Sequence, residues 1–192
     1  MTIKHQEDGS KTTLLFNEFT LVLHGFIIYD EENNTKNVQK DSVTIFAELG
    51  ETIEAKQLSI FSEFLQNIKI EQRFETSVTI MNEGPHCDLI DWIHFYSNWK
   101  FLKTNNNNQF ICAKYSSKEK EKFPQIPIEE LKLKVLEQCG EDWAKIIQYI
   151  KNPNEYPSGV NISRYFLRIS GDRKDSGEKI SKLIIIDVPM GC

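Results

Sequence analysis

The stretch ISRYFLRISGDRKDSGEKISKLIIIDV, from Ile162 to Val188, indicates how this chain folds. Its two ends, Ile162–Ile169 and Lys179–Val188, are rich in the β-branched and aromatic residues that are typical of strands. The segment between them, Ser170–Gly177, is composed of Ser, Gly, Asp, Arg and Lys, as expected of a turn. The pattern therefore predicts a β-hairpin at this end of the chain.

Strands are also expected near the other end of the chain. In Ser42–Leu49 the apolar residues Val43, Ile45 and Ala47 alternate with polar neighbours, which is typical of a strand with one buried face. Thr12–Tyr29 is apolar at both parities near its end, as in a strand that is covered on both faces. Phe74–Met81 and Gln109–Tyr115 are further predicted strands.

The period changes to that of a helix in three places. Gln57–Ile68 carries an apolar stripe that consists of Leu58, Phe61, Leu65 and Ile68. A second helix is expected to begin at Pro127 and to end at Gly140, with a buried stripe made of Leu131, Val135, Leu136 and Cys139. A third helix follows, with a stripe made of Trp143, Ile146, Ile147 and Ile150.

Strands at both ends of the chain and helices between them predict an α+β fold. We expect a mixed or antiparallel sheet built from N-terminal and C-terminal strands, with about three helices. The chain has 192 residues, of which 40% are hydrophobic, and this length and composition suit a single domain over residues 1–192.

The sequence predicts a cytoplasmic protein. It has neither a secretion signal at its start nor a run of about 20 apolar residues that could cross a membrane. Cys87, Cys112, Cys139 and Cys192 show no Cys-x-x-Cys spacing, so neither a zinc site nor a redox motif is indicated. In a reducing compartment these four residues are expected to be free thiols, and Cys139 to be a small core residue.

Charge is distributed unevenly along the sequence. Residues 1–96 hold 7 Lys and Arg against 16 Asp and Glu, a net charge of −9, whereas residues 97–192 hold 16 against 12, a net charge of +4. Clustered acidic residues favour a basic protein partner and disfavour nucleic acids and membranes. The predicted acidic interface consists of Asp30, Glu31, Glu32, Glu48, Glu51, Glu54, Asp88 and Asp91.

Two alternatives to this interface remain open. Arg164 and Arg168, with Phe166 between them, could form a basic face that contacts phosphate groups, although no RNA-binding consensus accompanies them. Alternatively, the acidic residues could serve only to keep the protein soluble.

The segment from Gly84 to His94 concentrates groups that could bind a metal ion. Its candidate ligands are His86, Asp88, Asp91 and His94. The competing interpretation is a polar turn over Trp92, and the sequence favours the turn because no second cluster supplies further ligands. Cys87 lies beside His86, but a Gly-x-Ser-x-Gly motif and a Gly-rich phosphate loop are both absent. No cofactor is therefore predicted.

The same segment carries a resemblance to a known class of proteins. The pattern reads Gly84-Pro85-His86-x-Asp88-Leu89-x-Asp91-Trp92-x-His94-x-x-Ser97-x-Trp99 and is followed by Ile162-Ser163-Arg164-Tyr165-Phe166. Over residues 80–170 the chain resembles the small immunity proteins of bacterial polymorphic-toxin and contact-dependent inhibition systems. The resemblance implies a protein without enzymatic activity that binds a cognate toxin in the cytosol and blocks its active site. It transfers no individual site residue.

Two hypotheses follow. The first is a non-catalytic protein that neutralises a basic toxin, of the nuclease type, through its acidic surface. The second is a small metal-dependent hydrolase centred on His86, Asp88, Asp91 and His94.

Overall fold

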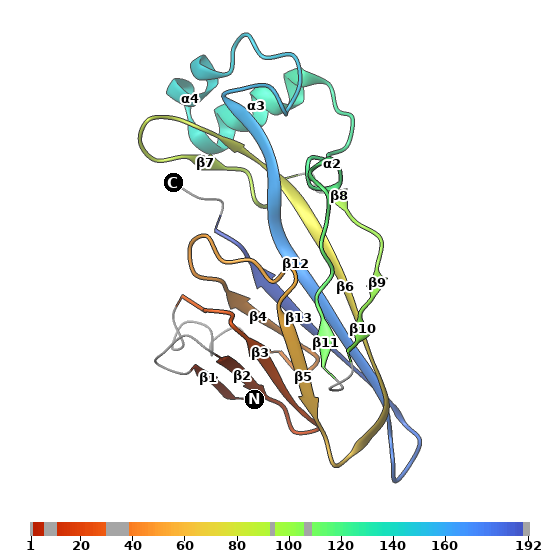
Figure 1. The fold of residues 1–192 in the computed structure, drawn as a ribbon. Helices are drawn as coiled ribbons and strands as arrows, with labels where there is room; N and C mark the ends of the chain where they lie inside the picture. The colour runs from red at the N-terminus through yellow and green to blue at the C-terminus, as the bar shows by residue number, and fades with distance from the viewer. Residues whose placement is uncertain (1, 6–10, 30–38, 93–94, 106–108, 190–192) are drawn as a thin grey trace. The chain divides into compact units, whose positions relative to one another are not determined.

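The computed structural model describes residues 2–5, 11–29, 39–92, 95–105 and 109–189 (Figure 1). The chain divides into two compact units. Unit 1 comprises Met1–Arg73, Asn98–Lys114 and Arg164–Pro189, and unit 2 comprises Phe74–Ser97, Tyr115–Ser163 and Met190–Cys192. Each unit therefore combines segments that are far apart in the sequence. The expected single domain stays a prediction, because compactness alone does not show whether either unit folds without the other.

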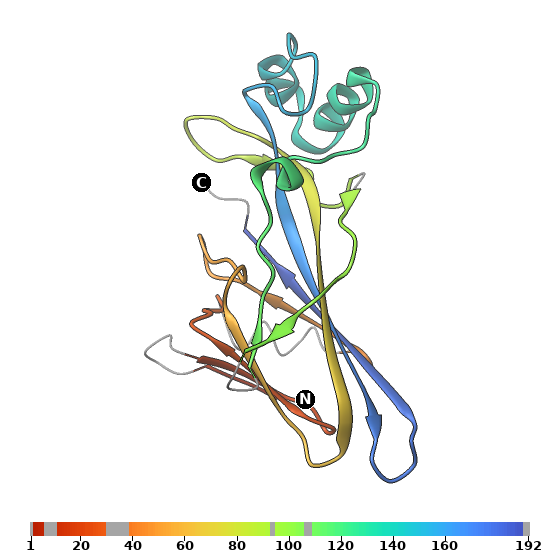
Figure 2. The same ribbon diagram turned by 45° about the vertical axis from the view of Figure 1, so that its right-hand side comes forward.

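A six-stranded antiparallel sheet belongs entirely to unit 1. Its strands, in spatial order, are β1 (Thr2–His5), β2 (Lys11–Leu15), β3 (Thr20–His24), β5 (Gln57–Phe61), β11 (Phe110–Ile111) and β10 (Lys103–Thr104). Figure 2 shows this sheet from a second direction. The side chains of Leu21 and Leu23 in β3 and of Leu58 in β5 are fully buried, so one face of this sheet covers an apolar core.

The second sheet has the strand order β4-β13-β12-β6-β7. Its strands are β4 (Ser42–Phe46), β13 (Lys179–Asp187), β12 (Ser158–Arg173), β6 (Leu65–Ile80) and β7 (Cys87–Asp88), and β8 (Phe95–Tyr96) and β9 (Lys100–Phe101) also pair with β6. The predicted hairpin is present, with Arg164 opposite Asp187 at one end and Asp172 opposite Lys179 at the other. Strand β4 runs parallel to β13, so this sheet is mixed, as expected.

Three helices of the described chain lie in unit 2, namely α2 (Ser117–Lys120), α3 (Ile128–Cys139) and α4 (Glu141–Ile146). The core of this unit consists of Val78, Ile80, Leu89, Leu131, Val135, Ile147, Ile150 and Val160. Strands and helices in separate parts of the chain confirm the α+β class.

The predicted stripe of α3 is correct at Leu131 and Val135, which are fully buried, but wrong at Leu136, which is 43% exposed. Leu131, Val135 and Cys139 follow one another at intervals of four residues and share a face. Leu136 is rotated by about 100° from Val135 and therefore points away from the core.

The helix expected at Gln57–Ile68 is also wrong, because strands β5 and β6 occupy this segment on either side of a tight turn. The hydroxyl of Ser62 organises the turn. It accepts hydrogen bonds from the backbone N–H groups of Phe64 and Leu65, at 3.1 and 2.9 Å, and donates one to the carbonyl of Glu18, at 2.6 Å. Such local side-chain bonds stabilise a turn at the expense of a helix.

Candidate functional site

The fold redistributes the charge that the sequence concentrates in its first half. Counted over its full sequence, unit 1 holds 16 Lys and Arg against 16 Asp and Glu, so its net charge is zero. Unit 2 holds 7 against 12, a net charge of −5. The basic C-terminal strands thus lie in the same unit as the acidic N-terminal segments, and the negative excess belongs to the unit that carries the helices.

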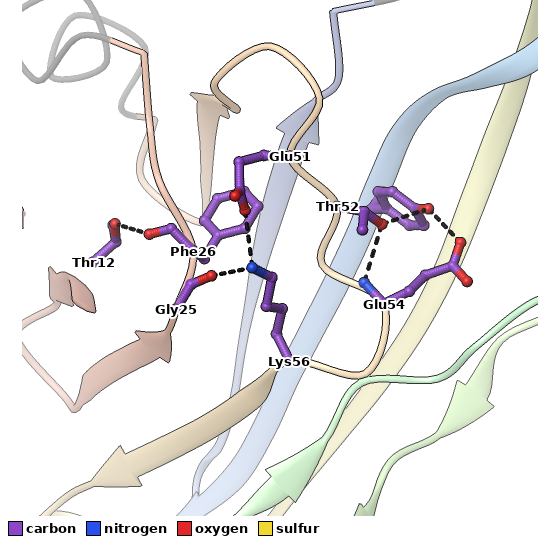
Figure 3. Close-up of polar contacts among 8 residues, drawn as sticks. Thr12, Gly25, Phe26, Glu51, Thr52, Glu54 and Lys56 are labelled. Atoms are coloured by element: carbon purple, nitrogen blue, oxygen red, sulfur yellow. Dashed lines mark hydrogen bonds and ion pairs between the residues drawn. The ribbon is translucent and has the colours of Figure 1, made fainter. Parts of the chain in front are cut away.

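The loop between β4 and β5 contains three of the predicted interface residues, Glu48, Glu51 and Glu54. Glu51 forms an ion pair with Lys56, whose Nζ lies 3.1 Å from Glu51 Oε2 and also donates a hydrogen bond to the Gly25 carbonyl (Figure 3). Both partners of the ion pair are largely buried. Glu51 therefore anchors the loop within unit 1.

Glu54 has a partner in the C-terminal strand β12. The hydroxyl of Tyr165 donates a 2.7 Å hydrogen bond to Glu54 Oε1 and lies 3.3 Å from the hydroxyl of Thr52 (Figure 3). Tyr165 itself is buried. Two of the three predicted carboxylates in this loop therefore hold it in place, and the side chain of Glu48 is partly buried. The predicted residues Asp30, Glu31 and Glu32 lie outside the described residues.

Of the candidate metal ligands, His86 lies in the turn between β6 and β7, Asp88 ends β7 and Asp91 follows it. His86 Nδ1 accepts a hydrogen bond from the backbone N–H of Asn82 at 3.3 Å, as expected of a polar turn. Asp88 lies opposite Thr79 in the β6–β7 pair, and Asp91 is exposed. His94 lies outside the described residues. Within the part of the chain that the structure describes, no three His, Cys, Asp or Glu side chains form a group that could hold a metal ion.

Asp88 has an unusual environment for a carboxylate. Burial raises its pKa, and this effect outweighs the opposing influence of the Thr79 hydrogen bond and the nearby His86. Its Oδ1 atom is buried, and none of the residues that the structure describes offers it a hydrogen bond. A carboxylate in this position costs stability when it is ionised, so Asp88 is poorly placed to contribute a strong negative charge to an interface.

Cys87 and Cys139 form a disulfide bond that joins β7 to the last residue of α3. The expectation of free thiols is therefore wrong for these two residues, because the fold brings positions 52 residues apart to a Cα–Cα distance of 6.1 Å. Cys112 is free and buried, and burial raises the pKa of its thiol. Disulfides persist mainly in oxidising compartments, so this pair does not support the expectation of a reducing one.

The two arginines that could have formed a basic face are both paired within unit 1. Arg164 Nε lies 2.7 Å from Asp187 Oδ1, and Arg168 lies 2.8 Å from Glu71 Oε2. The guanidinium of Arg168 also stacks on the ring of Trp99 at 4.4 Å. Both guanidinium groups are paired with carboxylates within unit 1, so this segment has little unpaired positive charge that could attract phosphate groups.

Helix α3 carries an exposed surface that the sequence pattern did not predict. The outward side of α3 carries Glu129, Glu130, Leu133, Leu136 and Glu137, all of them exposed, and we call this set the α3 face. Leu133 is 56% exposed and Leu136 43% exposed. Counting 100° per residue, all five lie within about 120° of one another around the helix. The signal in the sequence was Leu133, an apolar residue outside the predicted buried stripe.

Comparison with protein-family models, curated proteins and solved structures finds no match to this chain. Among the described residues, no helix is both long and apolar enough to cross a bilayer.

Proposed function

We propose that this protein is a non-catalytic binding protein that neutralises a basic protein toxin by covering the toxin's active site with the α3 face. The observation that carries the proposal is the pair of exposed leucines, Leu133 and Leu136, framed by three glutamates on one helix. This helix lies in the unit that holds a net charge of −5.

The α3 face combines the two features that a complex with a basic protein requires. Burying a leucine side chain completely contributes about 1.5–3 kcal/mol, so two leucines at the centre of an interface supply a substantial part of the binding energy. Surrounding carboxylates accelerate the encounter with a basic partner and fix its orientation. Glu129 and Glu137 pair with Lys132 and Lys134 at 3.2 Å, but such exposed pairs are weak and yield readily to a partner.

A nuclease-type toxin fits this chemistry. An enzyme that binds nucleic acid needs a basic surface to attract phosphate groups, and an acidic helix competes for the same surface. The resemblance of residues 80–170 to immunity proteins supports the same partner class, and α3 lies within that range. No cofactor is required for this function.

The experiment measures binding kinetics between the purified protein and basic proteins encoded by the genes adjacent to its own. We expect the double variant L133S/L136S to bind at least tenfold more weakly, because it removes the apolar centre while leaving the core of unit 2 intact. L49S is the matched control, since Leu49 is an exposed leucine of unit 1 (54% exposed). Equal losses in both variants, or none in L133S/L136S, would refute the α3 face as the interface.

Charge reversal tests the electrostatic part of the proposal. E129K/E130K/E137K should slow association at low salt, and the difference from wild type should shrink as salt is added. The control is E63K/E83K/D175K, which reverses three exposed carboxylates outside α3. If both triple variants slow association equally, net charge rather than the α3 face governs the encounter.

The proposal also places the protein in the cytoplasm, where the toxin would act. A reducing cytoplasm would open the disulfide that joins Cys87 and Cys139 in the structure. Alkylating the thiols at the moment of cell lysis, followed by mass spectrometry, tests this location. Recovery of the intact disulfide from freshly lysed cells would argue for an oxidising compartment.

A further inference from the structure

A polar pocket of about 470 Å³ lies in unit 1, beside the turn of the β12–β13 hairpin. Four cationic side chains line it, namely Lys40, Arg173, Lys179 and Lys182. They come from the segment before β4, from the end of β12 and from the start of β13. The fold thus gathers at one place four charges that the sequence spreads over more than 140 residues.

Lys182 is fixed at the wall of this pocket. It is only 9% exposed, and its Nζ lies 2.9 Å from the Lys40 carbonyl, 3.0 Å from Asp41 Oδ1 and 3.7 Å from Glu18 Oε1. The two carboxylates on this side of the pocket are therefore occupied by a buried ammonium group. Their negative charge is offset at close range, and little of it remains to repel an anion.

Arg173 differs from Lys182 in that one of its donors is unpaired among the residues that the structure describes. Its Nε atom is buried, and within the described part of the chain it has no hydrogen-bond partner. Buried N–H donors in proteins are nearly always paired with protein or with ordered water, so this donor is available to an acceptor from outside the described chain. Among the described residues, the ammonium groups of Lys40 and Lys179 also have no carboxylate partner, which leaves Glu178 as the remaining negative charge.

We propose that this pocket binds a small soluble phosphate compound, with Arg173 as the principal ligand and Lys179 and Lys40 as supporting charges. A guanidinium group presents several donors in one plane and suits the oxygens of phosphate better than any other side chain. The volume is in the range of small-molecule sites, and the lining is mainly polar. The inference does not depend on the proposed toxin binding, because the pocket and the α3 face belong to different units.

The test is titration of the full chain with inorganic phosphate and with pyrophosphate, followed by calorimetry and by amide shifts in NMR spectra. We expect saturable binding to one site, with shifts concentrated in residues 173–182. R173Q should weaken binding by about tenfold or more, which corresponds to the loss of a hydrogen bond to a charged group. K174Q is the matched control, since Lys174 is the exposed neighbour of Arg173 and does not line the pocket.

Two further variants ensure that the result does not depend on one substitution. K179Q should also weaken binding, and E178Q should strengthen it by removing the remaining repulsion, while the thermal unfolding midpoint of each variant shows whether the fold survives. Absence of saturable binding to wild type would overturn the proposal. It would also be overturned if R173Q and K174Q bound pyrophosphate equally, or if acetate bound as tightly as phosphate. Toxin binding by R173Q should equal that of wild type, which separates this test from that of the proposed function.

Discussion

Replacing the disulfide between Cys87 and Cys139 with two serines should destabilise unit 2, and unit 1 only to the extent that the two units unfold together. The two cysteines are separated by 52 residues, and closing a loop of this length in the unfolded chain is worth about 4 kcal/mol in the chain-entropy model. Native strain and residual structure usually reduce the effect, so we expect a loss of about 2–4 kcal/mol in the free energy of unfolding of unit 2. Cys139 ends α3, so the loss should be greatest at the C-terminal end of that helix.

The positions of the tryptophans make the assay selective. Trp92 and Trp143 pack against the core of unit 2, whereas Trp99 lies in unit 1. Urea unfolding of W99F, followed by tryptophan fluorescence, therefore reports on unit 2 alone, whereas W92F/W143F reports on unit 1. Each is measured with and without C87S/C139S.

Reductant provides the control for this experiment. Adding it should destabilise the oxidised wild-type protein and leave C87S/C139S unaffected, since the remaining described cysteine, Cys112, is a free thiol. A loss below about 1 kcal/mol in unit 2 would contradict this expectation, because it would fall well short of the loop-closure entropy expected for this disulfide. An equal loss in both reporters would show that the two units unfold as one domain.

Other predictions concern the pH dependence of stability, the apolar core of unit 2 and metal binding. Burial raises the pKa of Asp88 above its ordinary value of 3.8, so the native state binds this proton more tightly than the unfolded state does. The free energy of unfolding is therefore highest below pH 3.8 and falls as the pH rises through the native pKa. D88N should therefore be more stable than wild type at neutral pH and equal to it in acid, and denaturant midpoints at the two pH values check this. L131A should lower the free energy of unfolding by about 2–5 kcal/mol through a cavity at a fully buried site, whereas L133A should lower it by less than about 1 kcal/mol, as urea titration will show. Elemental analysis of the purified protein should detect no stoichiometric metal, and bound metal that disappears in H86A would favour the hydrolase alternative.

The spacing of apolar residues correctly predicted those strands and helices whose buried face lies within one continuous segment. The alternation of Val43 and Ile45 and the spacing of Leu131 and Val135 both correspond to buried faces. The helix predicted for Gln57–Ile68 was wrong because the end of one strand, a turn and the start of the next strand place their apolar residues at helical spacing. The side-chain hydrogen bonds of Ser62 decide between these alternatives, and a hydropathy pattern does not contain them.

The candidate site was harder to predict because it depends on which segments fold together. Summing charge over halves of the sequence implied an acidic N-terminal region, yet the fold places Arg168 beside Glu71 and Tyr165 beside Glu54 within unit 1. The disulfide likewise joins positions whose proximity is invisible until β7 and α3 are placed. Exposure of Leu136 was unpredictable for the same reason, since only the packed helix shows which of its faces meets the core.

The proposed function is tested most directly by finding a basic enzyme encoded by an adjacent gene and titrating its activity with this protein. If the proposal is correct, one equivalent of wild-type protein inhibits that enzyme completely, and L133S/L136S inhibits it incompletely at the same ratio. A toxin that stays fully active when saturated with wild-type protein, or one that L133S/L136S inhibits as well as wild type does, would contradict it.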